Sequence, residues 1–139
     1  MRTPRAWQGL ALVIGVLLSG APWGFCAAQR SGTASWYNVE SAIREGTCTD
    51  AKHRRCLQAN GRPLQDEAFT AASWDYPFST ALQITGPDGS HVRCVVRDRG
   101  PARTLYRHGR ILDLSRACFQ ALAPLAQGIV QVTVEAIPE

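Results

Sequence analysis

The chain has 139 residues, of which 45% are hydrophobic, so it is long enough for one domain with a modest core and too short for two of ordinary size. Residues 1–28 contain Arg2 and Arg5 but no acid, so without them the formal net charge falls from +4 to +2. A domain that is this weakly basic does not favour nucleic acid as a partner.

The first 28 residues have the three parts of an export signal. Arg2 and Arg5 form a basic start, an apolar run follows from Leu10 to Leu18, and small residues lead to a cleavage position after Ala28. The apolar run is about half of what a bilayer-spanning helix needs, which favours cleavage over stable membrane insertion. We therefore predict a signal peptide at 1–28 and a single domain at 29–139. The protein would then be exported to the periplasm, the cell wall or the medium.

Most of the remaining chain has the pattern of short strands. Alternating or small residues predict strands over the ranges 31–37, 69–73, 81–85, 90–97, 111–114 and 129–137. Gly-Pro-Asp-Gly at 86–89 is typical of a hairpin turn. Residues 38–60 are polar and irregular, with one helical turn expected near 40–44, and residues 102–110 are interpreted as a basic loop. Ser115 is expected to cap a short helix.

Cysteine usage agrees with export. Four of the five cysteines remain after cleavage, and an even number in an exported protein favours two disulfides, for which three pairings are possible. The pairing Cys48–Cys56 with Cys94–Cys118 is preferred, and the alternative for the second pair is two buried free thiols. The spacings predict no metal site. Together these features predict a mainly β protein, a small closed barrel of five or six strands with one or two short helices.

The stretch from Val92 to Ala117 carries the candidate site. A strand pattern with Val92, Cys94 and Val96 on one face runs into Asp98, and a second extended segment leads to Asp113. Both carboxylates are expected at strand ends on one rim of the barrel, with arginines around them. Trp36 and Tyr37 are each either core residues or a platform on which a sugar ring stacks.

Several blocks in order resemble a known family. They are Ala-Ser-Trp-Tyr at 34–37, Ala-Asn-Gly at 59–61, Phe-Thr-Ala-Ala at 69–72, Pro-Phe-x-Thr at 77–80, Asp-Arg-Gly-Pro at 98–101 and Ile-Leu-Asp-Leu-Ser-Arg-Ala at 111–117. Together they resemble the rare lipoprotein A (RlpA) family, whose fold is the six-stranded double-psi β-barrel. Expansins and some endoglucanases share this barrel, and in them a phrase like Asp-Leu-Ser carries an acidic active-site residue.

The resemblance implies an endolytic peptidoglycan lytic transglycosylase. Such an enzyme cleaves glycan strands that lack stem peptides and leaves 1,6-anhydro ends, with one carboxyl group as acid and then base, and it uses no cofactor or metal. The resemblance implies Asp98 as the catalytic residue and Asp113 as a supporting residue. Asn60, Arg62, Ser73 and Arg99 are expected to hold substrate. The partner would be peptidoglycan glycan, with no nucleic acid, and a monomer is expected.

Two departures keep a second function open. The family usually has Glu where this chain has Arg62, and His where it has Ser73. A non-catalytic, expansin-like wall-glycan binding module is therefore the alternative, in which Arg62 would pair with glycan carboxylates. Asp98 would then be a structural carboxylate that accepts turn amides or pairs with an arginine. A secreted inhibitor or structural partner is a third possibility for a small disulfide-bonded barrel.

Overall fold

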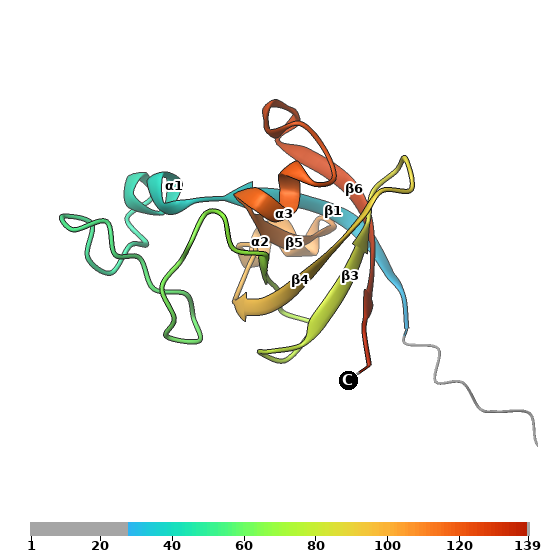
Figure 1. The fold of residues 1–139 in the computed structure, drawn as a ribbon, viewed down its shortest axis with the longest axis horizontal. Helices are drawn as coiled ribbons and strands as arrows, with labels where there is room; N and C mark the ends of the chain where they lie inside the picture. Colours follow the sequence, from blue (N-terminus) through green and yellow to red (C-terminus); the bar gives the residue numbers. More distant parts are fainter. Residues whose placement is uncertain (1–27, 139) are drawn as a thin grey trace, which may run out of the picture.

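The computed structural model describes residues 28–138, so the predicted signal peptide lies almost wholly outside the described residues. Six strands close into a barrel in the order β1-β5-β2-β4-β3-β6 (Figure 1). Their bounds are β1 Arg30–Tyr37, β2 Thr70–Ala72, β3 Ala81–Thr85, β4 His91–Asp98, β5 Arg110–Ser115 and β6 Ile129–Ala136. The predicted six-stranded barrel is confirmed.

Two parallel strand pairs set the topology. β1 pairs in parallel with β5, and β2 pairs in parallel with β4, while every other neighbouring pair is antiparallel. Two neighbouring parallel strands cannot be joined by a tight hairpin, so the chain must cross over between them. Between β2 and β4 the chain forms β3, and between β1 and β5 it forms β2, β3 and β4, so neither pair is a βαβ unit. This is the double-psi arrangement that the family resemblance implies.

Alternation along the strands fills the barrel. Val130, Val132 and Val134 of β6 are at most 2% exposed, while residues between them face outward. Val92, Cys94 and Val96 of β4 are buried, as their spacing predicts. The inward faces of the strands and the helix side chains of Cys118 and Phe119 form the main core, which also includes Ala34, Leu82, Ile84, Leu112 and Leu114. A second, smaller core contains Ala42, Cys56 and Leu64.

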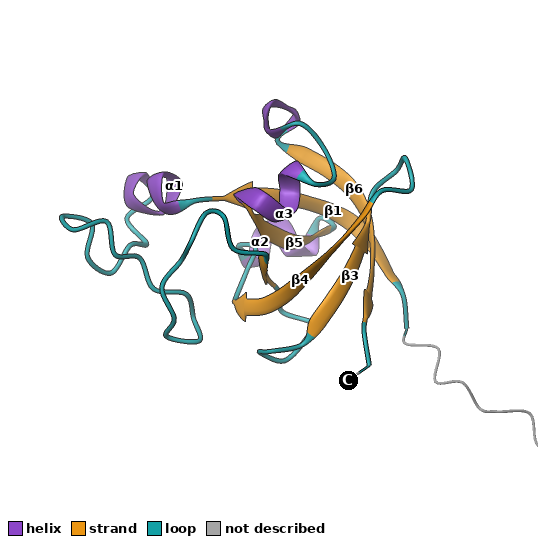
Figure 2. Cartoon of the chain, in the orientation of Figure 1, coloured by secondary structure: helices purple, strands orange, loops and turns teal. Residues whose placement is uncertain are grey.

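Three short α-helices and one 3-10 turn lie outside the barrel wall (Figure 2), which is one α-helix more than expected. They are α1 Val39–Arg44, α2 Arg103–Arg107, α3 Arg116–Gln120 and η1 Leu125–Gln127. The additional element is α2, in the segment interpreted as a basic loop. No side chain caps its start, and no apolar stripe marked it in the sequence. Ser115 caps α3 as predicted, with its hydroxyl accepting the Cys118 amide.

A long excursion between β1 and β2 projects from one side of the barrel in Figure 1 and carries α1. A disulfide between Cys48 and Cys56 closes part of it, and Cys94–Cys118 joins β4 to α3. This is the pairing preferred from the sequence. Among residues 28–138, no helix is long and apolar enough to cross a membrane.

Candidate functional site

A cavity of about 390 Å³ lies between the barrel rim and the excursion. Its floor comes from β1, β2, β4 and β5, one wall comes from α1 and the loop behind it, and another comes from the turn after β4. The lining includes Tyr37, Glu45, Leu57, Ala59, Ala72, Trp74, Asp98, Arg99, Gly100, Pro101 and Asp113. Both aspartates singled out from the sequence therefore line one cavity.

The short strand β2 brings the two aspartates together. Ala72 is the register partner of Asp98 on β4 and of Asp113 on β5, so one small residue lies between them. A β-carbon added at Gly100 would be 3.5 Å from Asp113 Oδ2 and 3.3 Å from the Ala72 β-carbon. Small residues at positions 72 and 100 thus leave space beside the Asp113 carboxyl group. Asp113 lies inside β5, not at its end, because Leu114 and Ser115 still pair with β1.

Asp98, the last residue of β4, uses both of its oxygens as acceptors. Oδ1 accepts the Ala59 amide at 2.9 Å and the Arg99 amide at 2.8 Å, and Oδ2 accepts the Tyr37 hydroxyl at 3.1 Å. These bonds join the excursion, β1 and the turn after β4 at one carboxylate. Asp98 thus holds the rim of the cavity in shape.

The guanidinium of Arg99 is engaged elsewhere. It donates to the backbone oxygens of Ser73 at 2.7 Å and Tyr76 at 3.0 Å, and it lies 3.9 Å above the centre of the Phe78 ring. In the described part of the chain, Asp98 makes no ion pair. The arginine next to Asp98 therefore fixes the 73–78 loop instead of neutralising the carboxylate.

Asp113 has a different environment. The Ser35 hydroxyl donates to Oδ1, whereas Oδ2 has no hydrogen-bond partner among residues 28–138. Burial is the main cause that raises the pKa of Asp113 above its ordinary value, and the negative charges of Glu45 and Asp98 act in the same direction. The Ser35 hydrogen bond and the charge of Arg110 lower the pKa and offset part of this effect. Asp113 is thus the carboxyl group of the cavity that is suited to hold a proton.

Tyr37 connects the two polar parts of the site. Its hydroxyl donates to Asp98 and accepts the Gln58 side-chain amide at 3.3 Å, and the same amide also bonds Thr70 Oγ1 at 3.3 Å. Burial and the neighbouring Asp98 raise the pKa of Tyr37 far above its ordinary value, so the phenol stays neutral. Tyr37 is therefore a cavity residue, whereas Trp36 packs against Phe119 as part of the core.

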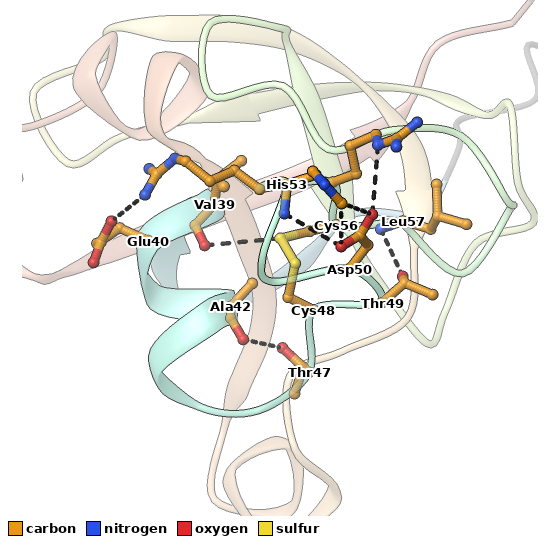
Figure 3. Close-up of a disulfide and its surroundings, with 12 residues drawn as sticks. Val39, Glu40, Ala42, Thr47, Cys48, Thr49, Asp50, His53, Cys56 and Leu57 are labelled. Atoms are coloured by element: carbon orange, nitrogen blue, oxygen red, sulfur yellow. Dashed lines mark hydrogen bonds and ion pairs between the residues drawn. A yellow bond between two sulfur atoms is a disulfide. The ribbon is translucent and has the colours of Figure 1, made fainter.

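The excursion provides the outer wall (Figure 3). Its disulfide lies beneath α1, with the Cys56 sulfur 3.9 Å from the Val39 carbonyl oxygen, and Thr47 donates to the Ala42 carbonyl at 3.2 Å. Glu45, which ends α1, lines this wall and is exposed. Glu45 could not be predicted as a site residue, because a single Glu in a polar segment has no distinguishing pattern.

Trp74 also lines the cavity and was not predicted from the sequence. Its indole N–H donates to the Pro101 carbonyl at 2.6 Å, next to the cis Gly100–Pro101 bond. The guanidinium of Arg103, the first residue of α2, lies 3.6 Å above the centre of the indole ring. Trp74 is distant in sequence from the Asp-Arg-Gly-Pro motif at 98–101, but its side chain contacts that motif in the folded protein.

Three residues expected to hold substrate do not line the cavity. Ser73 is fully buried, and its hydroxyl accepts the Asp75 amide. Asn60 accepts the Arg62 amide in a turn, and the Arg62 carbonyl accepts the Gln58 amide. The local structure therefore uses Asn60 and Ser73 to shape loops. Of the six predicted site residues, Asp98, Arg99 and Asp113 meet in the cavity.

The described residues thus form a closed six-stranded double-psi β-barrel in which two aspartates line one cavity. Residues 29–134 match the family described as "Lytic transglycolase". The chain belongs to this family, and specifically to its RlpA-like members.

The relatives are longer proteins. The endolytic peptidoglycan transglycosylase RlpA of Vibrio cholerae is 31% identical over 117 residues, which are 84% of this chain and 37% of that protein. RlpA of Rickettsia felis is 31% identical over 109 residues, or 78% of this chain and 42% of that protein. The chain thus spans less than half the length of these curated relatives.

Solved structures share the fold. Clavibacter michiganensis expansin superposes with a TM-score of 0.56 at 22% identity, covering 81% of this chain and 52% of the expansin. A Streptomyces papain inhibitor gives 0.56 at 21% identity, covering 80% of this chain and 96% of the inhibitor. The same barrel therefore occurs in proteins with quite different names, and the site must decide the function.

Proposed function

We propose that this chain is an exported peptidoglycan lytic transglycosylase that cleaves peptide-free glycan strands and leaves 1,6-anhydro ends. The single observation that carries the proposal is the half-buried Asp113 carboxyl group, with its raised pKa, in a cavity of about 390 Å³. A general acid needs a pKa raised toward the working pH, and burial is the usual means. Membership of the lytic transglycolase family and the predicted signal peptide at 1–28 support the same assignment.

The reaction needs one carboxyl group that acts twice. Asp113 donates its proton to the glycosidic oxygen as the bond from this oxygen to C1 breaks. The 6-hydroxyl oxygen of the same sugar then bonds to C1, and its proton passes to the Asp113 carboxylate. The carboxyl group is regenerated, and no water enters the product. Hydrolysis, by contrast, requires a positioned water and in most cases a second carboxylate.

Asp98 supports this step in the proposal. Its three hydrogen bonds engage both oxygens and hold the rim around the substrate, and its negative charge favours the positive charge that develops on the sugar ring. The family resemblance implies the reverse division, with Asp98 as the acid. The hydrogen bonding of the two groups favours Asp113, whose Oδ2 has no hydrogen-bond partner among residues 28–138 and lies near Gly100.

The test is product analysis with peptide-free glycan strands. We expect fragments with 1,6-anhydro ends, identified by mass spectrometry, and loss of at least roughly a hundredfold in rate for Asp113→Asn. Asp88→Asn is the matched control, since Asp88 is an exposed aspartate in the β3–β4 hairpin. Fragments with reducing ends would refute the lyase reaction, and full activity of Asp113→Asn would refute the assignment of the acid.

A non-catalytic glycan-binding module is the second candidate. The observation that favours it is the position of Ser73, which is buried and replaces the His usual in the family, so the chain has no ionisable group there. Arg62 likewise replaces an acid. Co-sedimentation with purified sacculi distinguishes the two: retention in the pellet without any released fragment supports binding alone. Any fragment that depends on Asp113 rules this candidate out.

A further inference from the structure

The charge of the cavity is unbalanced. Asp98, Asp113 and Glu45 line it, and the arginine in the lining, Arg99, donates its hydrogen bonds to the 73–78 loop. Asp113 holds its proton in the proposed reaction, so the repulsion comes from the carboxylates of Asp98 and Glu45, and a glycan that carries carboxylates is repelled from the part of the cavity where they lie. Its acidic substituent must therefore lie at another part of the cavity, next to a cation.

The part of the cavity beside Trp74 provides that cation. The Arg103 guanidinium is stacked on the indole ring at 3.6 Å, and in the described part of the chain it donates no hydrogen bond and makes no ion pair. Arg103 is exposed, so its planar set of N–H donors faces solvent at the edge of the cavity. Such a donor set matches a carboxylate with two parallel hydrogen bonds.

Two contacts restrict the side chain of Trp74, which favours stacking of its ring on a sugar. The hydrogen bond from its indole N–H to Pro101 and the guanidinium on its ring restrict the side chain, while the ring itself lines the cavity. A restricted aromatic ring binds the apolar face of a sugar with little loss of conformational entropy. The guanidinium covers one face of the indole ring, so the opposite face is the apolar platform for a sugar and the cation lies behind it.

We propose that Trp74 and Arg103 form a subsite that selects sugars bearing a carboxylate. Trp74 stacks on the sugar ring, and Arg103 binds the carboxylate of its substituent. The substrate is thereby oriented with its acidic group at α2 and its glycosidic bond toward Asp113. This inference rests on the proposed function, which identifies the substrate as peptidoglycan glycan. What is new is that Trp74 and Arg103 determine which glycans bind.

Binding measurements by calorimetry, made separately from cleavage, test the subsite. The probes are peptide-free peptidoglycan strands, oligogalacturonate and neutral chitin oligosaccharides. Arg103→Gln is expected to weaken binding of both carboxylate-bearing glycans roughly tenfold and to leave chitin binding within about twofold. Trp74→Phe, which keeps an aromatic ring, retains binding, whereas Trp74→Ala weakens all three probes. The selectivity of the wild-type protein should also shrink at high salt.

Arg107→Gln is the matched control, because it removes the same charge from an exposed residue of the same helix. It should change no affinity by more than about twofold. Equal losses for neutral and acidic probes in Arg103→Gln, or no loss at all, would overturn the subsite, as would an absence of glycan binding. Selective binding without cleavage would instead leave the subsite standing and refute the proposed enzyme. If one of the two acidic probes binds more tightly, the comparison shows whether the subsite prefers the carboxylate of peptidoglycan strands or that of oligogalacturonate.

Discussion

Removal of one oxygen atom in Tyr37→Phe tests whether the Asp98 network holds the site. The phenol donates to Asp98 Oδ2 at 3.1 Å and accepts from Gln58 at 3.3 Å. A hydrogen bond to a charged group contributes about 1.5–3 kcal/mol, whereas Gln58 keeps its second bond to Thr70. We therefore expect the free energy of unfolding to fall by about 2 kcal/mol.

The corresponding change in melting temperature follows from the size of the domain. About 110 described residues unfold with an entropy near 2.1 cal/mol/K per residue, so each kcal/mol shifts Tm by about 4 °C. Scanning calorimetry should show a decrease of about 8 °C for Tyr37→Phe. Cleavage of glycan strands should slow roughly tenfold or more at 25 °C, where the variant is still folded, because the rim around Asp113 loosens.

Tyr106→Phe is the matched control. This phenol also donates to a carboxylate, Asp75 Oδ1 at 2.5 Å, but it lies outside the cavity lining, and Asp75 keeps its ion pair with Arg30. We expect a similar loss of stability and little loss of activity. An unchanged Tm in Tyr37→Phe, or an activity loss no greater than that of Tyr106→Phe, would show that the network does not position the site.

Three further predictions concern the acid, the space beside it and the altered positions. Burial raises the pKa of Asp113, so the folded protein binds this proton more tightly than the unfolded chain does. The stabilisation from the protonated carboxyl group is fully present at low pH and is lost as pH rises through the raised pKa. Asp113→Asn should therefore raise Tm at pH 7 and not at pH 3, measured by calorimetry at both. Gly100→Ala places a β-carbon 3.5 Å from Asp113 Oδ2, so the rate of glycan cleavage should fall while Tm changes little. Ser73→His inserts a large ring where a fully buried hydroxyl lies, and it should lower the free energy of unfolding by about 1–3 kcal/mol in denaturant titrations without restoring the family's usual site.

Each of these has a clear contrary result. A lower Tm for Asp113→Asn at neutral pH would mean that the ionised carboxylate stabilises the fold. Normal cleavage by Gly100→Ala would show that the substrate does not approach the acid from that side. A stable Ser73→His variant with higher activity would mean that residue 73 can reach the cavity.

Alternation and motif spacing were enough to predict the barrel. The positions of Val92, Cys94 and Val96, and the alternating run at 129–137, assign inward faces without any knowledge of neighbours, because side chains of a strand alternate between its two faces. The family motifs likewise pointed to Asp98 and Asp113. Both line one cavity, but the expectation that each ends a strand holds for Asp98 and not for Asp113, which lies inside β5.

The roles within the site required the tertiary structure. Sequence could not reveal that Ala72 separates the two aspartates or that the Asp98 oxygens accept three donors from different parts of the chain. Trp74 and Glu45 enter the cavity only because loops distant in sequence fold over the rim.

What the sequence alone determined was therefore local: strand periodicity, the cap at Ser115 and the motifs that carry the aspartates. What only the tertiary structure decided was the environment of each group. The proton affinity of a carboxyl group and the freedom of an arginine depend on burial and on partners, and these are set by contacts between strands. For this reason the raised pKa of Asp113, on which its proposed role as the acid rests, could not be predicted from the sequence motif.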